Sequence, residues 1–372
     1  MSRFLISCGG TGGHLAPGIA LAEGLQARGH VATLLISQKK IDARLSEKYP
    51  QLRFERMPGT GFSWQPVKLV KCIVSQLRAY RFCRLLIRRE APDAIVGFGG
   101  FTSAPVVLAG RRSGLPVVLH EANRVPGRAI RTLGRFATRV YLPPGIQLPN
   151  LAPAALRHAG LPVRREIARH ATADARRALG FNPAQRLLVI FGGSQGASAL
   201  NNWAHKHLPE FAAQGVQVCC VTGPGKGESE TLGLPSKTGA TVRAQFLPFS
   251  DRVAELLSAA DLVISRAGAG TIAELVRCET PAILIPFPHA ADDHQRANAA
   301  YFQQQGGGLV VEQTKLAELQ AMTFSTLFDE PRLAEFRANL HRMDRDNPLS
   351  AMVSDLEQLT SSSVQQTASV AR

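Results

Sequence analysis

Two glycine-rich segments are the parts of this chain best suited to chemistry. Residues 9–14 read GGTGGH after an apolar run at 3–7, and residues 192–196 read GGSQG after an apolar run at 186–191. Glycine at such a turn lets backbone N–H groups approach a phosphate without a Cβ in the way, and a following helix N-terminus adds partial positive charge. The pattern predicts two phosphate-binding loops. Glycine used only for tight turns is the alternative, and it is weaker when the arrangement occurs twice.

Two common nucleotide-binding patterns do not fit these segments. Counting G-x-G-x-x-G from Gly10 puts Leu15 where the last glycine belongs, and no acidic residue closes the apolar run at 34–38. Neither segment ends in Gly-Lys-Ser/Thr, and residues 225–227 (GKG) lack the hydroxyl residue. These departures disfavour a nicotinamide-dependent enzyme and a Walker-type NTPase.

Charged residues near the glycines suggest a nucleotide with a diphosphate. Glu274 falls early in the helix predicted after residues 268–271 (GAGT), where a carboxylate could accept hydrogen bonds from two ribose hydroxyls. A helix-start glutamate with no ligand is an equal alternative. Arg164 and Arg266 could neutralise a diphosphate leaving group. Since the acidic pair at 292–293 is adjacent rather than spaced as D-x-D, we expect chemistry without a metal or other cofactor.

These residues depend on elements that repeat along the chain. An apolar run, a small-residue loop and an amphipathic segment follow one another, which is the βαβ pattern of a parallel sheet covered by helices. A helix is predicted over 17–28. Strands are predicted at 3–7, 31–36, 94–96, 116–119, 186–191, 216–221, 262–265 and 282–285. Because ligands of open α/β sheets lie beyond the carboxyl ends of the strands, we expect an α/β fold of two doubly wound Rossmann-like domains facing across a cleft.

The domain boundaries follow from composition. Residues 141–163 are rich in Pro and Gly and lack periodicity, which predicts a linker near 160–164. We expect domains at 1–160 and 161–345. Residues 346–372 should form a C-terminal helix that packs back on the first domain, with a mobile Ser-, Gln- and Thr-rich tail from 361.

Composition limits the class of protein. The chain has 372 residues, 45% hydrophobic and 19% charged, which suits two α/β domains, and no apolar stretch reaches spanning length, so we expect a cytoplasmic protein. The six cysteines form no C-x-x-C pair, which favours buried reduced thiols over zinc ligands. The net charge of +15 favours polyanions: nucleic acid, acidic lipid or a phosphorylated substrate.

One segment suggests that acidic lipid is among the polyanions that this chain binds. Residues 67–89 read as a helix with an apolar stripe beside a basic one, as in helices that lie on an anionic membrane. A core helix with a solvated basic face is the alternative. Nucleic acid would need aromatic residues interleaved with basic ones, and the sequence has no such array. The apolar stripe contains Leu69, Val70, Ile73, Leu77, Tyr80 and Ile87, and the basic stripe contains Lys68, Lys71, Arg78 and Arg89.

Six motifs in a fixed order carry a family resemblance. They resemble the N-acetylglucosaminyltransferases of peptidoglycan synthesis, a family of GT-B glycosyltransferases, over the chain from its first strand to about Asn298. The motifs are 9–14, Gly97-x-Gly99-Gly100, His120-Glu121-x-Asn123, Pro162-Val163-Arg164, 192–197 and Arg266-x-Gly268-x-x-Thr271-x-x-Glu274.

The resemblance implies a reaction and its location. The family transfers GlcNAc from UDP-GlcNAc, with inversion and without a metal, to the C4 hydroxyl of MurNAc in undecaprenyl-pyrophosphoryl-MurNAc-pentapeptide (lipid I), giving lipid II. It works as a peripheral protein on the cytoplasmic face of the membrane. The family pattern thus implies UDP-GlcNAc, lipid I and an anionic membrane surface as partners, and no nucleic acid.

The resemblance also implies roles for individual residues. In the N-terminal half, Thr11, Gly12 and Gly13 would hold the acceptor diphosphate, and Asn123 and Arg164 would complete the site. In the C-terminal half, the residues that would bind the donor are Ser194 at the diphosphate, Ser250 at uracil through its backbone, Arg266, Ala269, Gly270 and Thr271 around the nucleotide, Glu274 at the ribose, and His294 and Gln295 at the sugar hydroxyls.

An inverting transfer needs a base for the attacking hydroxyl. His14 is the first choice, because the pKa of an imidazole suits proton abstraction near neutral pH. A histidine that only caps the helix is the alternative, and Glu121 is the rival base or an orienting group. His120-Glu121 does not extend to H-E-x-x-H, so zinc protease chemistry has no support.

Four positions depart from the family pattern and bear on donor selectivity: Leu161, Ser250, Gly270 and His294. Two other functions compete with the one implied. A related transferase that moves a hexose from a UDP-sugar to a glycolipid would share the donor loops. A basic nucleotide- or nucleic-acid-binding protein without activity would need no base, which His14, Glu121 and Glu274 together argue against.

Overall fold

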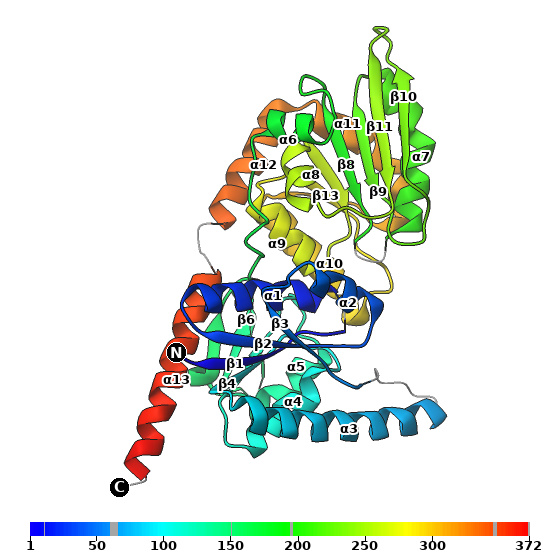
Figure 1. Cartoon of the computed structure of the whole chain (residues 1–372). Helices are drawn as coiled ribbons and strands as arrows, with labels where there is room; N and C mark the ends of the chain where they lie inside the picture. The colour runs from blue at the N-terminus through cyan, green and yellow to red at the C-terminus, as the bar shows by residue number, and fades with distance from the viewer. Residues whose placement is uncertain (11, 60–65, 150, 194–195, 345–347, 371–372) are drawn as a thin grey trace. The chain divides into compact units, whose positions relative to one another are not determined.

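The computed structural model describes residues 1–10, 12–59, 66–149, 151–193, 196–344 and 348–370 (Figure 1). The chain forms two compact units, Met1–Arg165 with Asn347–Arg372, and Glu166–Asp346. The first unit extends past residue 160 because Arg164 Nη1 donates to the Tyr49 hydroxyl at 3.1 Å and the Arg165 N–H donates to Glu23 at 3.2 Å.

The first unit is built on one parallel sheet of seven strands, in the order β3-β2-β1-β4-β5-β6-β7. Its central strands are continuous apolar runs because helices cover both faces of such a sheet. The strands are β1 (Arg3–Ser7), β2 (Val31–Ile36), β3 (Arg53–Arg56), β4 (Ala94–Gly97), β5 (Val117–His120), β6 (Arg139–Leu142) and β7 (Leu156–His158). The helices are α1 (Gly12–Ala27), α2 (Lys40–Glu47), α3 (Pro66–Glu90), α4 (Ser103–Arg112), α5 (Arg128–Leu133) and α13 (Pro348–Val370), with short 3₁₀ turns at Gly134–Phe136 and Pro153–Ala155.

The second unit repeats the architecture, with strand order β10-β11-β9-β8-β12-β13-β14 and only the pair β10–β11 antiparallel. The strands are β8 (Leu187–Phe191), β9 (Gln217–Val221), β10 (Glu230–Pro235), β11 (Thr241–Leu247), β12 (Leu262–Ser265), β13 (Ala282–Leu284) and β14 (Gly308–Val310). The helices are α6 (Thr172–Ala178), α7 (Ser198–Ala213), α8 (Val253–Ala259), α9 (Ala269–Arg277), α10 (His294–Gln304), α11 (Leu316–Leu327) and α12 (Glu330–Met343), with 3₁₀ turns at Ala291–Asp293 and Gln313–Lys315.

The predicted α/β class is confirmed in each unit, and every predicted strand is present within a residue of its expected bounds. The first helix differs, since α1 begins at Gly12 rather than at residue 17. Its first residues include Gly12 and Gly13, which have low helix propensity, so tertiary packing rather than local sequence forms this turn. Gly18 shows how close that packing is, because a Cβ there would lie 2.5 Å from the Cβ of Cys8.

Helix α13 belongs to the first unit. Its Met352, Val353 and Leu356 are buried in the core of that unit. At the helix surface, Tyr141 donates to Asp355 at 2.5 Å and Arg28 pairs with Glu357 at 2.8 Å. The helix continues to Val370, past residue 361, where we expected a tail to begin. Extension costs little once a packed segment has nucleated the helix.

The cysteines are buried, as predicted. All six are free thiols. Burial raises the pKa of Cys83, Cys219, Cys220 and Cys278 to about 12. Among the residues that the structure describes, no group of three or more His, Cys, Asp or Glu side chains could hold a metal ion. No described helix is long and apolar enough to cross a membrane.

Candidate active site

The first glycine loop joins β1 to α1 at the carboxyl edge of the sheet. It approaches the neighbouring strand closely, because a Cβ at Gly9 would lie 2.3 Å from the backbone nitrogen of Ser37. Gly10 has φ +110°, a conformation that favours glycine. Gly12 and Gly13 begin α1, so their backbone N–H groups belong to a helix N-terminus. Thr11 lies outside the described residues.

His14 lies in the first turn of α1 against the loop that follows β4. A Cβ at Gly100 would lie 3.1 Å from His14 Nδ1, and one at Gly99 would lie 3.6 Å from Nε2. The glycines of this loop therefore make room for the imidazole. Burial lowers the pKa of His14 to about 4, with Asp42 acting to raise it and Lys39 to lower it. The ring is neutral near pH 7, the form that accepts a proton.

Glu121 follows β5 and is 5% exposed. Its Oε1 accepts hydrogen bonds from the backbone N–H and the side-chain amide of Asn123, at 2.8 and 3.0 Å. Its Oε2 accepts from the N–H of Gly127 at 2.7 Å. Both carboxylate oxygens thus hold the segment between β5 and α5, which favours the orienting role over the role of base.

His120, which precedes Glu121, anchors the chain near the end of the first unit. Its Nε2 donates to the Gly160 carbonyl at 3.1 Å, and its ring packs against Phe98 and Tyr141. Burial lowers the pKa of His120 to about 4. We therefore assign His120 a structural role. Arg164 lies four residues beyond Gly160, and its guanidinium contacts the Tyr49 hydroxyl.

The second glycine loop joins β8 to α7. A Cβ at Gly192 would lie 2.2 Å from the backbone nitrogen of Ala197, and one at Gly196 would lie 2.1 Å from the Thr222 carbonyl oxygen. Lys226 Nζ donates to the Gly196 carbonyl at 3.0 Å. Ser194 lies outside the described residues.

Helix α9 places four predicted residues together in the second unit. Gly268 is its N-cap residue, and Ala269, Gly270 and Thr271 form the first turn. Glu274 is half-buried on the next turn. The free N–H groups of such a helix start favour a negatively charged ligand.

Arg266, which we expect near a diphosphate, makes several contacts within the second unit. Its Nη1 donates to the carbonyls of Ile285 and Pro286, at 3.1 and 3.3 Å, and its Nη2 donates to Gln313 at 2.5 Å. The guanidinium also lies over the ring of Phe287, and burial lowers its pKa. These contacts hold the guanidinium of Arg266 on the segment after β13.

The predicted sugar-reading pair sits at the start of α10. Gln295 Oε1 accepts from the Phe287 N–H at 2.9 Å, so its amide N–H groups are the donors left for a ligand. His294 Nδ1 lies 2.7 Å from the Ala291 carbonyl and must donate to it, which makes Nε2 an acceptor in the neutral ring. Ser250 Oγ accepts from the Arg252 N–H at 3.1 Å, consistent with a ligand contact through backbone rather than hydroxyl.

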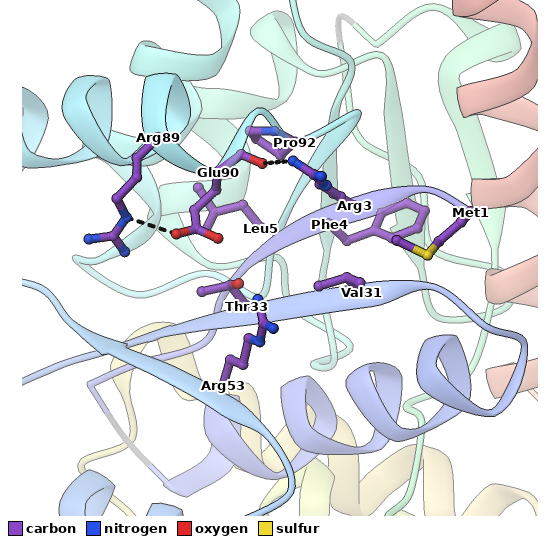
Figure 2. Close-up of a pocket in the computed structure, with 10 residues that line it drawn as sticks. All are labelled: Met1, Arg3, Phe4, Leu5, Val31, Thr33, Arg53, Arg89, Glu90 and Pro92. Atoms are coloured by element: carbon purple, nitrogen blue, oxygen red, sulfur yellow. Dashed lines mark hydrogen bonds and ion pairs between the residues drawn. The ribbon is translucent and has the colours of Figure 1, made fainter.

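A cavity of about 250 Å³ lies at the opposite edge of the first sheet (Figure 2). Arg3 and Val31, at the amino ends of their strands, line it together with Arg89 and Glu90 from the end of α3. Arg3 donates to the Glu90 carbonyl at 3.1 Å, and Arg89 pairs with the Glu90 carboxylate at 2.8 Å. Ligands of parallel sheets bind at the carboxyl edge, so this cavity is separate from the candidate site.

Helix α3 divides its apolar residues between core and surface. Cys83, Leu86 and Ile87 are buried, which corrects the placement of Ile87 in a surface stripe. Ile73 is 53% exposed and Leu77 58% exposed. Lys71 and Arg78 are also exposed, and Tyr80 is half-buried. The side chains of Lys68, Leu69 and Val70 lie outside the described ones.

Comparisons with known proteins place the chain in a family. The N-terminal domain model of glycosyltransferase family 28 matches residues 4–142, and its C-terminal domain model matches residues 187–344. The chain belongs to glycosyltransferase family 28, and its fold is that of the GT-B glycosyltransferases.

Comparisons with individual proteins are more specific than the two domain models. The chain is 65% identical to the UDP-N-acetylglucosamine--N-acetylmuramyl-(pentapeptide) pyrophosphoryl-undecaprenol N-acetylglucosamine transferase of Opitutus terrae, over 97% of this chain and 96% of that protein. It is 39% identical to the protein of the same name from Parasynechococcus marenigrum, over 84% of each chain. Among solved structures, MurG of Acinetobacter baumannii is similar with a TM-score of 0.71 and 26% identity, over 96% of this chain and 100% of that one.

Proposed function

We propose that this chain transfers GlcNAc from UDP-GlcNAc to the C4 hydroxyl of MurNAc in undecaprenyl-pyrophosphoryl-MurNAc-pentapeptide, converting lipid I to lipid II in peptidoglycan synthesis. The relative from Opitutus terrae, which carries the name of this activity, supports the substrates. The structural observation that carries the proposal is His14, a neutral imidazole held against Gly99 and Gly100 beside a glycine loop.

In the proposed mechanism, His14 takes the proton of the C4 hydroxyl as its oxygen attacks the anomeric carbon of GlcNAc. The bond from that carbon to the diphosphate oxygen breaks, UDP leaves, and the configuration inverts. Thr11, Gly12 and Gly13 would bind the acceptor diphosphate. Glu121 would orient Asn123, whose two N–H contacts it accepts.

The second unit would bind the donor. Glu274 would accept from the ribose hydroxyls, and the first turn of α9 at 269–271 would line the nucleotide. Gln295 would donate to a sugar hydroxyl while His294 Nε2 accepts from one. Ser250 would face uracil and Ser194 would donate a hydrogen bond to the diphosphate. The positive charge of Arg164, from the first unit, would neutralise part of the diphosphate charge in place of a metal.

One assay separates this reaction from its rivals. Purified protein with labelled UDP-GlcNAc is offered a short-chain lipid I analogue or diacylglycerol. We expect transfer to the lipid I analogue only. Transfer to diacylglycerol would instead identify a glycolipid-forming enzyme, and transfer to neither by a folded protein would leave a binding protein.

The His14→Ala variant tests the base. We expect kcat to fall by about 10²- to 10⁴-fold while the Kd for UDP-GlcNAc stays the same, because a general base acts on the chemical step. His170→Ala is the control, since this exposed histidine lies outside the candidate site. A near-normal kcat in His14→Ala would assign the base to another residue.

We further propose that α3 holds the protein on the cytoplasmic face of the membrane. Exposed Ile73 and Leu77 beside Lys71 and Arg78 combine apolar and cationic groups on one helix, which suits an anionic lipid surface.

Vesicle binding tests this placement. The double variant Ile73→Glu with Leu77→Glu should lose most of its binding to vesicles containing anionic lipid. Phe328→Glu, at a 48% exposed position in the second unit, is the control and should bind normally. Equal binding by both variants would argue that another surface contacts the lipid.

A further inference from the structure

Lys39, just before α2, and Asp42, in the first turn of α2, hold Gly10 on both sides. The N–H of Gly10 donates to Asp42 Oδ2 at 2.8 Å, and its carbonyl accepts from Lys39 Nζ at 2.7 Å. Both peptide groups of a residue at φ +110° are therefore fixed by charged side chains. This residue leads directly into the segment that carries His14.

Asp42 is fully buried, and its Oδ2 also accepts from the N–H and hydroxyl of Ser37, at 3.0 and 2.6 Å. Within the described part of the chain, its Oδ1 has no hydrogen-bond partner. Removing a carboxylate from water is costly unless hydrogen bonds compensate. Asp42 binds the N–H groups of Gly10 and Ser37 together, so its carboxylate links the first glycine loop to the end of β2.

Lys39 reaches Gly10 from the opposite side. Its ammonium lies 5.5 Å from the centre of the Phe101 ring, in the range of a cation–π contact. That ring also faces the glycine, since a Cβ at Gly10 would lie 3.0 Å from Phe101 Cε1. The lysine, the ring and the glycine therefore contact one another.

We propose that Asp42 and Lys39 are positioning residues that fix the peptide groups of Gly10 and, through them, the loop that binds the acceptor diphosphate and leads into His14. This inference rests on the proposed function, because it assigns the loop to the acceptor. It extends that function to two residues that do not touch the reacting atoms.

The two side chains also carry opposite charges toward His14. Asp42 from α2 raises the pKa of His14, and Lys39 from the segment before α2 lowers it. The loop packed on the other side of the ring supplies Gly99 and Gly100, which have no charge. Loss of either charge should therefore move this pKa, in opposite directions.

Four variants test the proposal. Asp42→Asn and Lys39→Met should each raise the KM for a short-chain lipid I analogue about 10- to 100-fold, the effect of losing a hydrogen bond to a charged group, and leave the Kd for UDP-GlcNAc unchanged. Ser37→Ala, which removes a partner of Asp42 but keeps its charge, is the matched control and should change KM much less. Lys39→Arg should recover most of the activity.

An NMR titration of the His14 imidazole in the free protein gives a readout that a structural role would not produce. The pKa should fall in Asp42→Asn and rise in Lys39→Met, while Ser37→Ala leaves it in place. Unchanged KM values, or shifts of the same sign, would overturn the proposal. If Asp42→Asn does not fold, the variants of the exposed Lys39 test the proposal by the same KM and pKa measurements.

The wild-type arm keeps the two hypotheses apart. A wild-type protein that transfers GlcNAc while the variants behave normally contradicts only the positioning role. A wild-type protein that transfers to no acceptor contradicts the proposed function, and the role on acceptor binding with it, whatever the titration reports.

Discussion

Gly10 in the first glycine loop and Gly196 in the second are held in place by different means, although Gly9 also packs closely on backbone, at Ser37. In the first unit, charged side chains bind both peptide groups of Gly10. In the second unit, backbone packs on backbone, because Gly196 leaves no room for a Cβ next to the carbonyl of Thr222. A side-chain hydrogen bond to the described part of this loop comes from Lys226, which is exposed. A glycine that faces a side chain, as Gly10 does, can accept a small change, whereas a glycine that faces backbone, as Gly196 does, tolerates almost none.

The largest effect is expected at Gly196. An alanine there would combine φ +67° with a Cβ 2.1 Å from a carbonyl oxygen, so the loop must move. We expect Gly196→Ala to weaken UDP-GlcNAc binding by more than about 100-fold and to lower the Tm, as a shift in strained backbone costs about 1–3 kcal/mol before any clash.

Gly193→Ala is the matched control for this variant. Gly193 has φ +77°, yet a Cβ there meets nothing within 4 Å. It should show only the strain of the left-handed backbone, about 1–2 kcal/mol in stability. Equal donor affinities in the two alanine variants, measured by calorimetry, would remove backbone packing as the reason for glycine at residue 196.

A smaller effect is expected from Gly10→Ala. The nearest obstacle to a Cβ is an edge of the Phe101 ring at 3.0 Å, and a side chain can turn away. We expect the KM for the lipid I analogue to rise roughly tenfold, because φ +110° strains an alanine by about 1–3 kcal/mol even when the ring moves aside. Adding Phe101→Leu should recover part of this loss, and an effect as large as that of Gly196→Ala would contradict the contrast between the loops.

The smallest effect is expected from Lys226→Met. Its exposed ammonium bonds only a neutral carbonyl, and surface charges contribute little in water. The KM for UDP-GlcNAc should rise by about two- to fivefold and less at high salt, where screening weakens the charge. A loss as large as that of Lys39→Met would mean that both loops depend on lysine equally.

Sequence patterns predicted the parts of the fold that are locally encoded. The central strands and glycine loops were predicted because buried parallel strands are continuous apolar runs and tight approaches require glycine. The hairpin of β10 and β11 was missed, since the edge strand Glu230–Pro235 is largely exposed and contains a glycine and a proline.

The candidate site shows the same limit. The sequence could not choose between base and orienting group for Glu121, because the choice depends on where the Gly127 N–H lies. The sequence suggested a diphosphate as the partner of Arg266, because it does not show that the carbonyls of Ile285 and Pro286, after β13, lie beside the guanidinium. Asp42 went unnoticed since its partner Gly10 is near only through the pairing of β1 with β2. The pairing of β1 with β2 was itself predictable. An acidic residue soon after the second strand of such a sheet is therefore a candidate partner for the backbone of the first glycine loop.

The placement of α13 has a consequence for how the protein is made. Met352, Val353 and Leu356 complete the core of the first unit, although the ribosome synthesises them after every residue of the second unit. The half translated first must therefore wait for the last-made helix before its core can close, while the half translated later can fold before it. During that interval the nascent chain lacks the residues of α13 that pack on α1, where Leu349 lies against Gly24.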